Sequence, residues 1–218
     1  MIIKTCGLRA PENIAALAKL PIDWFGFICY PQSSRYIGPE ATALRQYLAD
    51  QPVPQQRVGV FVNASIDEIR AAVAHLNLNL LQLHGEESPA FCAAVRAALS
   101  VGGGEPLPLI KAFRVGPDFD FQLTAAYAPY CSYFLFDTKG ETHGGTGQKF
   151  DWSVLRQYVG DTPFLLSGGI GPTDAAAVKA FQHPRLIGID VNSKFERAPG
   201  LKDAQKLNEF LTAIITSS

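Results

Sequence analysis

Eight short apolar segments, rich in β-branched and aromatic residues, recur along the whole chain. Such continuous apolar runs are typical of strands that are buried on both faces of a sheet. They cover residues 2–6, 24–30, 57–63, 80–85, 109–115, 133–138, 163–169 and 186–193. The pattern therefore predicts eight buried strands.

Amphipathic segments with helix-start signals lie between these runs. Pro11 opens the first, Ser65 with Glu68 three residues later has the pattern of a capping box, and Ser88 precedes Pro89. The expected helices cover residues 10–20, 65–76, 88–99, 119–127, 151–159, 172–181 and 202–215. The alternation of strand and helix predicts a parallel sheet with right-handed crossovers.

Eight units in 218 residues give about 27 residues for each strand–helix pair, which is the spacing of a closed α/β barrel. The sequence therefore predicts the α/β class and a single (β/α)8 TIM barrel that forms one domain over residues 1–218. The alternative is a doubly wound open sheet, which usually stops at five or six strands. The glycine- and proline-rich segment 100–108 joins the fourth helix to the fifth strand, on the face away from the strand C-termini, so we expect no function there.

Composition limits the classes of partner. The chain is 47% hydrophobic and 18% charged, so it can bury a core and is not a disordered protein. A formal net charge of −1, without any run of like charges, gives no electrostatic footprint for nucleic acid. We therefore expect a small-molecule partner.

The four cysteines, Cys6, Cys29, Cys92 and Cys131, are far apart and show no zinc-site spacing, so we expect neither a metal site nor a disulfide framework. The N-terminus enters an apolar strand pattern without the features of a signal peptide, and no segment approaches the roughly 20 apolar residues of a membrane span. These features predict a cytoplasmic protein with reduced thiols and no membrane partner.

Polar residues at the ends of the expected strands are informative, because a barrel assembles its active site where the strands end. The first strand ends at Cys6, the second leads to Arg35, and the fourth, fifth and sixth end at His84, Arg114 and Asp137. The seventh ends in SGGI from Ser167 and the eighth in DVNS from Asp190.

Barrels that bind phosphate commonly do so with the loops after strands seven and eight. Gly168 and Gly169 would let the backbone approach an anion closely, although an SGG sequence is also an ordinary tight turn.

Cys6 has an inert and a reactive interpretation. A cysteine in this kind of strand is most often a buried, unreactive residue. Lys4, however, lies two residues earlier on the same strand face, and a nearby ammonium favours the thiolate, the form that accepts a proton. We therefore expect the pKa of the Cys6 thiol to be lowered, unless Lys4 is paired lower in the barrel.

The other strand-end residues also have two interpretations. Asp137 follows four apolar residues, so desolvation is expected to raise its pKa toward that of a general acid, while the alternative is a loop cap. Arg35 offers a bidentate fork to a substrate carboxylate, or is a plain surface charge. His84 is either a functional group or a core histidine. Arg114 is either a functional group or a solvated loop residue.

Seven segments together resemble phosphoribosylanthranilate isomerases over essentially the whole chain, and GGTG followed by FDW is the most specific of their motifs. They are residues 4–7, 26–37, 58–63, 81–85, 136–152, 165–170 and 188–196. The resemblance implies an Amadori rearrangement of a phosphosugar, in tryptophan biosynthesis, without metal or organic cofactor. It also implies that the protein is a monomer or a homodimer.

The resemblance also implies residue roles. Cys6 looks like the general base and Asp137 like the general acid, and Arg35 resembles the contact to the anthranilate carboxylate. Gly168, Gly169, Asn192 and Ser193 match the phosphate site, and His84 is counted with the substrate-binding residues. Residues 144–147 resemble a mobile segment that covers the site.

Two departures from the family pattern stand out: Ser34 replaces a usual proline, and Asn192 and Lys194 replace small residues. The role of Lys194 stays open between a phosphate contact and a solvated side chain. Two rival functions are another phosphate-binding barrel enzyme, which would rely on paired carboxylates or a metal, and an inert phosphosugar-binding protein. The presence of both Cys6 and Asp137 argues against each of them.

Overall fold

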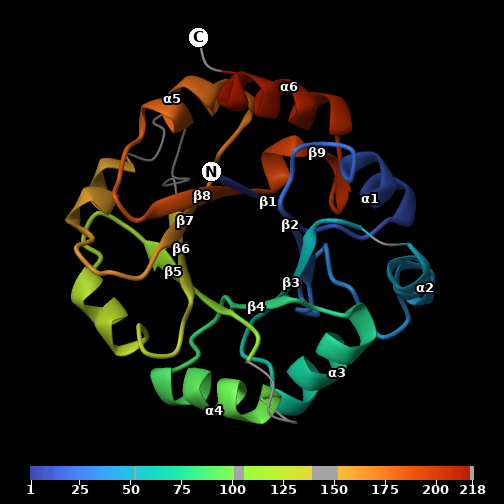
Figure 1. Ribbon diagram of the computed structural model, residues 1–218, viewed down its shortest axis with the longest axis horizontal. Helices are drawn as coiled ribbons and strands as arrows, with labels where there is room; N and C mark the ends of the chain where they lie inside the picture. Colours follow the sequence, from blue (N-terminus) through green and yellow to red (C-terminus); the bar gives the residue numbers. More distant parts are fainter. Residues whose placement is uncertain (52, 101–105, 139–151, 217–218) are drawn as a thin grey trace.

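A computed structural model describes residues 1–51, 53–100, 106–138 and 152–216. Eight parallel strands form a closed barrel in the order β1 to β8, and β8 pairs with β1 to complete it. Figure 1 shows this ring from one end, with helices around it. The strands are β1 (Ile2–Cys6), β2 (Trp24–Ile28), β3 (Gln56–Phe61), β4 (Leu80–Leu83), β5 (Leu109–Val115), β6 (Tyr133–Thr138), β7 (Phe164–Ser167) and β8 (Leu186–Val191). The predicted (β/α)8 barrel and its eight strands are confirmed.

The α-helices are α1 (Pro11–Leu17), α2 (Thr42–Asp50), α3 (Ile66–Leu76), α4 (Pro89–Leu99), α5 (Ala175–Ala180) and α6 (Ala204–Ile215). Helix α3 begins as predicted, because the Ser65 side chain accepts a hydrogen bond from the backbone N–H of Glu68 and the Glu68 carboxylate accepts one from Ser65. Helix α2 was not among the predicted helices. Its N-cap is Ala41, which has no capping side chain and so gives no start signal in the sequence.

Two predicted helices, at residues 119–127 and 151–159, are 3₁₀ helices: η1 (Phe121–Ala126) and η2 (Trp152–Gln157). An aromatic cluster lies at both segments. Phe121 and Tyr158 both pack on Phe136 of β6, with ring centroids 5.4 and 5.1 Å away. Rings from η1 and from the segment after η2 therefore cover β6, beside 3₁₀ helices of six residues each.

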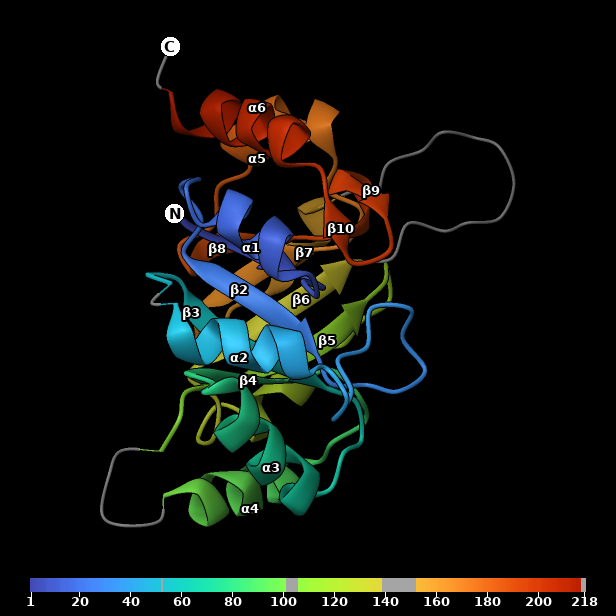
Figure 2. The ribbon, with the colours of Figure 1, turned by 90° about the vertical axis from the view of Figure 1, so that its right-hand side faces the viewer.

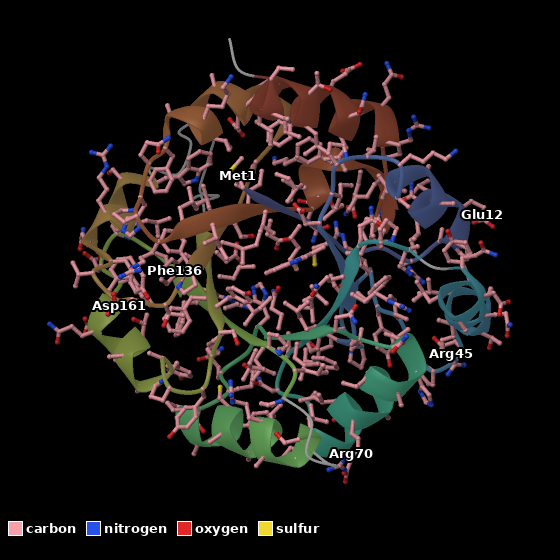
Figure 3. All side chains as sticks on the ribbon, viewed as in Figure 1. Met1, Glu12, Arg45, Arg70, Phe136 and Asp161 are labelled. Carbon is pink, nitrogen blue, oxygen red and sulfur yellow. The ribbon has the colours of Figure 1, made fainter. Side chains whose placement is uncertain are left out.

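The core has two parts. One fills the barrel interior with Trp24, Val58, Leu80, Ile110, Ala112, Leu135 and Leu165. The other lies between the barrel and its helices and is larger. Figure 3 shows side chains in both places, and the labelled Glu12, Arg45, Arg70 and Asp161 lie at the periphery. The interior is therefore a packed floor, on which a site can form only at an end of the barrel.

The C-terminal ends of the strands share one side of the molecule. Figure 2 shows the arrows of β2, β5 and β6 pointing toward the side of a small antiparallel ribbon, β9 (Glu196–Ala198) and β10 (Leu201–Lys202). This ribbon follows β8 and the short helix η4 (Ser193–Phe195). Within the described ranges, no helix has the length and apolar character needed to cross a bilayer.

Candidate active site

A cavity of about 210 Å³ lies at the C-terminal ends of the strands. Seven of the eight predicted site residues line it, and Arg35 is the exception. The described lining consists of Cys6, Ile28, Val60, Gln82, His84, Asp137, Ser167, Gly168, Gly169, Ile170, Asp190, Asn192, Ser193 and Lys194. Strands that are distant in the sequence thus bring the predicted thiol, carboxyl and imidazole to one place.

Two larger cavities, of about 480 and 760 Å³, contain none of the predicted site residues in their described linings. One lies against α3 and the segment after β2, and the other lies between η1 and the segment after η2. The size of a cavity therefore does not identify the candidate active site. The titratable side chains that converge on the smaller cavity identify it.

Cys6 is buried at the end of β1, where Gly26 of β2 is its partner in register. A Cβ atom at position 26 would lie only 2.8 Å from Sγ of Cys6 and 2.9 Å from its Cα. Glycine at this position therefore makes the room that the thiol occupies. Gly26 begins one of the family-like segments, but the sequence alone did not assign it to the site.

Lys4 shares the inner face of β1 with Cys6, as predicted, and is completely buried. Its Nζ donates to Oδ1 of Asp190 at 2.9 Å, and the two residues are partners in the β1–β8 register. Burial is the largest single influence and disfavours the ammonium, but the charges and hydrogen bonds of Asp190 and Cys6 together outweigh it and raise the pKa of Lys4. Lys4 is therefore charged and is shared between Asp190 and the thiol.

The predicted lowering of the pKa of Cys6 is wrong in direction. Burial raises the pKa of the thiol above its ordinary value, and the Lys4 and Lys202 ammonium groups oppose burial without overcoming it. Asp190 adds to the rise. The sequence showed that Lys4 is near Cys6. It did not show that the thiol is buried, or that the Asp190 carboxylate pairs with the same lysine.

A second group of charges reaches the same thiol from the ribbon after β8. The buried Lys202 Nζ donates to Oδ1 of Asn192 at 2.7 Å and to Oε1 of Glu196 at 2.6 Å. Burial raises the pKa of Glu196, but its hydrogen bonds to Arg35 and Lys202 outweigh this and bring the pKa to about 2. The linked set near Cys6, among the described residues, thus consists of two groups that both act on the thiol: Lys4 with Asp190, and Lys202 and Arg35 with Glu196.

Arg35 lies at the rim of the site and not on the wall of the cavity. Its Nε and Nη2 donate to the Glu196 carboxylate at 2.8 and 2.5 Å. The side chain passes over Gly7, whose φ is +78° and where a Cβ would lie 2.6 Å from Cδ of Arg35 and 3.0 Å from Oδ1 of Asn192. Arg35 is thus an ordered, paired side chain rather than a plain surface charge. Its contact with a substrate carboxylate stays a prediction.

Asp137 and His84 contact each other on the wall of the cavity. The Nε2 of His84 lies 3.3 Å from Oδ2 of Asp137, and its Nδ1 lies 2.7 Å from Nε2 of Gln82. The side chains of His84 and Asp137 are 23% and 28% exposed, so both are open to the cavity. His84 is therefore not a core histidine. Arg114, the partner of Asp137 in register, is exposed and does not belong to the described lining.

The loops after β7 and β8 form the remaining wall. Gly168 and Gly169 have φ values of +99° and +67°, and a Cβ at Gly169 would meet no atom within 4 Å, so open space lies in front of this backbone. Ser193 and Lys194 are exposed on the same wall. The sequence leaves two roles for Lys194, a phosphate contact or a solvated side chain, and the structure places this exposed residue in the lining of the cavity. Residues 144–147 lie outside the described residues.

Four residues of this arrangement were not singled out from the sequence: Gly26, Gln82, Glu196 and Lys202. Asp190 was named at the end of the eighth strand, but it was given no role. Gln82 could have been found, because it lies on an inner strand face two residues before His84. Glu196 and Lys202 follow the barrel strands, and only the ribbon after β8 brings them back to Cys6.

The fold and this arrangement define the class of protein: a (β/α)8-barrel enzyme whose candidate site is suited to proton transfer on a small anionic molecule. Within the described part of the chain, no group of three or more His, Cys, Asp or Glu side chains is arranged to hold a metal ion. The thiol, carboxyl and imidazole that line this cavity offer acid–base chemistry.

Comparison with known proteins gives the particular family. The family model for N-(5′-phosphoribosyl)anthranilate (PRA) isomerase matches residues 3–213. The chain is 46% identical to the N-(5′-phosphoribosyl)anthranilate isomerase of Parabacteroides distasonis, over 99% of this chain and 94% of that protein. It is 42% identical to the enzyme of the same name from Phocaeicola vulgatus, over 98% of each.

Solved structures agree. Phosphoribosylanthranilate isomerase from Thermotoga maritima superposes with a TM-score of 0.80 at 32% identity, over 98% of each chain. A phosphoribosylanthranilate isomerase in complex with reduced 1-(o-carboxyphenylamino)-1-deoxyribulose 5-phosphate superposes with a TM-score of 0.78 at 29% identity. The chain belongs to the N-(5′-phosphoribosyl)anthranilate isomerase family, and its activity is that aldose–ketose isomerisation in tryptophan biosynthesis.

Proposed function

We propose that Asp137 is the general acid and Cys6 the general base of the rearrangement of N-(5′-phosphoribosyl)anthranilate to 1-(2-carboxyphenylamino)-1-deoxyribulose 5-phosphate. The observation that carries this assignment is that the thiol of β1 and the carboxyl of β6 line one cavity, together with the glycine loop after β7. A sugar bound between the two groups would offer its ring oxygen to one of them and its C2 proton to the other.

The proposed steps transfer protons only. Asp137 gives a proton to the furanose ring oxygen, the C1–O bond breaks, and the lone pair of the anilino nitrogen forms the C=N bond of a protonated Schiff base. The Cys6 thiolate then removes the proton from C2, the C2–H electrons form the C1=C2 bond of an enolamine, and the C=N π electrons return to the anilino nitrogen. Transfer of the enol proton and protonation of C1 give the ketone. Atoms and electrons are conserved without an oxidant or reductant.

The charges near Cys6 support its role as the base. The linked set contains three cations and two carboxylates among the described residues, and so carries one excess positive charge. One thiolate balances it. Because burial keeps the pKa of Cys6 raised, the thiolate is the minor form at neutral pH, and its fraction grows as the pH rises.

Two separate groups of residues are proposed to bind the two anionic ends of the substrate. The backbone at Gly168 and Gly169, with Asn192 and Ser193, would hold the phosphate, because the glycines leave open space for an anion. Arg35 would meet the anthranilate carboxylate from the rim. The ligand of the related solved complex carries both a carboxylate and a phosphate, in keeping with two anion sites.

We further propose that residues 1–218 form one domain, that the protein needs no cofactor, and that it acts in the cytoplasm as a monomer or homodimer on this phosphosugar. The related Thermotoga maritima enzyme is described both as a dimer and as monomers generated from it.

Complementation tests the proposal. The chain should restore growth without tryptophan to a bacterial strain that lacks this isomerase. Cys6→Ser and Asp137→Asn should not restore growth, while Arg70→Gln, on the exposed face of α3, serves as a matched surface control. Growth with either site variant, at equal amounts of protein, would remove the corresponding role.

A further inference from the structure

Gln82 presents its amide nitrogen to His84. The residue lies on the inner face of β4, two positions before His84, and is 1% exposed. Its Nε2 is 2.7 Å from Nδ1 of the imidazole. An amide nitrogen can only donate, so Nδ1 of His84 has to be the acceptor and carries no proton.

The other imidazole nitrogen then carries the proton. A neutral imidazole has one N–H, so the proton lies on Nε2, which is 3.3 Å from Oδ2 of Asp137. In this form each contact joins a donor to an acceptor. The opposite tautomer would place two donors against each other at Gln82 and, whenever Oδ2 of Asp137 carries no proton, two acceptors against each other at Asp137.

The orientation of the Gln82 amide fits its surroundings. Its Oε1 is buried and has no hydrogen-bond partner among the described residues. Rotating the amide by 180° would instead leave the NH2 group, with two hydrogens, without partners, and orphaned buried N–H groups are the rarer case. Packing alone does not explain a glutamine here, because Leu80, on the same face of the strand, belongs to the apolar floor. The contact with His84 is the one polar interaction that this side chain makes in the described structure.

We propose that Gln82 is a positioning residue that holds the proton of His84 on Nε2, so that His84 donates a hydrogen bond to Oδ2 of Asp137. The proposal rests on the assignment of Asp137 as the general acid. With Oδ2 engaged as an acceptor, the acidic proton is directed to Oδ1 of Asp137. When that proton passes to the ring oxygen, the carboxylate that remains is stabilised by the bond from His84.

The direct test is the tautomer of His84, measured by ¹⁵N–¹H NMR of the imidazole nitrogens in the full-length protein, with signals assigned from His84→Asn. The wild type should show the proton on Nε2. Gln82→Glu replaces the donor by a carboxylate, and should place a proton on Nδ1. Gln82→Met neither donates nor accepts, and should give a mixture of tautomers.

Turnover supplies the second readout. Gln82→Met should lower kcat by roughly 2- to 10-fold, the range for one hydrogen bond, and leave KM within about 2-fold, because substrate contacts are unchanged. Gln55→Met is the matched control: Gln55 is also buried with an unpartnered Oε1, but it lies just before β3, away from the cavity. It should leave both the tautomer and kcat unchanged.

The proposal is overturned if wild-type His84 carries its proton on Nδ1, if both Gln82 variants keep the wild-type tautomer, or if Gln82→Met mixes the tautomers while kcat stays the same. The NMR result needs no turnover, so it is independent of the role of Asp137. If Asp137→Asn keeps a normal kcat, the acid assignment fails instead, whatever tautomer His84 shows.

Discussion

Arg35 and Glu196 are 161 residues apart in the sequence and form a two-pronged ion pair at the rim of the barrel, with Nε–Oε1 and Nη2–Oε2 distances of 2.8 and 2.5 Å. Glu196 also accepts from Lys202, which in turn holds Asn192 on the cavity wall. This one carboxylate therefore links the proposed substrate-carboxylate contact to the wall of the proposed phosphate site. Its charge state should matter for stability as well as for binding.

Replacement of Arg35 should weaken binding according to what the new side chain can offer. Arg35→Ala removes the charge and the fork, while Arg35→Lys keeps the charge alone, so the alanine variant should bind a product analogue more weakly. The loss for alanine should be roughly 10- to 150-fold, the range for a charge-assisted hydrogen bond. Calorimetric titration of both variants measures it, with Arg70→Ala on α3 as a control. Wild-type affinity in both would show that Arg35 does not contact the substrate.

Glu196 should make stability depend on pH in the acid range. Its pKa is about 2 in the folded protein against an ordinary value of 4.5, so its contribution is fully present above pH 4.5 and is lost as the pH falls toward 2. The contribution at neutral pH is on the order of 3 kcal/mol. Urea unfolding should show Glu196→Gln to be less stable than the wild type at pH 7. The difference should shrink between pH 4.5 and 3, and a difference that stays constant over this range would exclude the depressed pKa.

The thiolate fraction of Cys6 should increase through the whole range from pH 7 to 9, because its pKa is raised. The rate also needs the proton of the proposed acid, so kcat/KM should be bell-shaped in pH, with limbs that report macroscopic values. Lys202→Met removes one of the two ammonium groups that lower this pKa, so it should lower kcat/KM at pH 7 by roughly 3- to 10-fold.

Absorbance of the thiolate at 240 nm, taken as the difference from Cys6→Ser, measures the Cys6 titration directly. The Lys202→Met curve should lie at higher pH than the wild-type curve. Coincident curves would show that Lys202 does not act on the thiol, and a wild-type thiol titration that is complete below pH 7 would contradict the raised pKa.

Gly26→Ala should displace Cys6 and lower both stability and kcat, whereas a Gly→Ala change at a position with open space should not. Its new Cβ would lie 2.8 Å from Sγ of Cys6, so the thiol or the strand has to move. Overpacking of this kind costs about 1–3 kcal/mol, and displacement of the base should lower kcat by at least about 10-fold. Gly116→Ala is the control, because a Cβ there meets no atom within 4 Å. Equal stability and kcat for the two variants would show that β1 and β2 adapt without effect.

The sequence predicted those features that depend on neighbours along the chain. Eight apolar runs and the Ser65 capping box follow from local periodicity and hydrogen bonding, and they are present. The meeting of Cys6 with Asp137 was also predictable, because parallel strands of a barrel end on one face. Helix α2 was missed because Ala41 gives no cap signal.

The sequence could not predict the pKa shifts and ion pairs that depend on the whole fold. Lys4 next to Cys6 suggested a lowered thiol pKa, but burial of both groups and the charge of Asp190 reverse the sign. Arg35 was predicted as a free fork, and Glu196 reaches it only through the turn of β9 and β10. Such pairings have no local pattern to reveal them.

The central claim is that Cys6 removes the C2 proton and Asp137 supplies the ring proton, and turnover by Cys6→Ser and Asp137→Asn tests it most directly. Each variant should lose at least about 100-fold in kcat, the low end for general acid and base catalysis, while its affinity for a product analogue changes by less than about 3-fold. A Cys6→Ser protein that keeps a near-normal kcat with the wild-type pH profile would contradict the account, because Cys6 would then be a packing residue and the base would lie elsewhere.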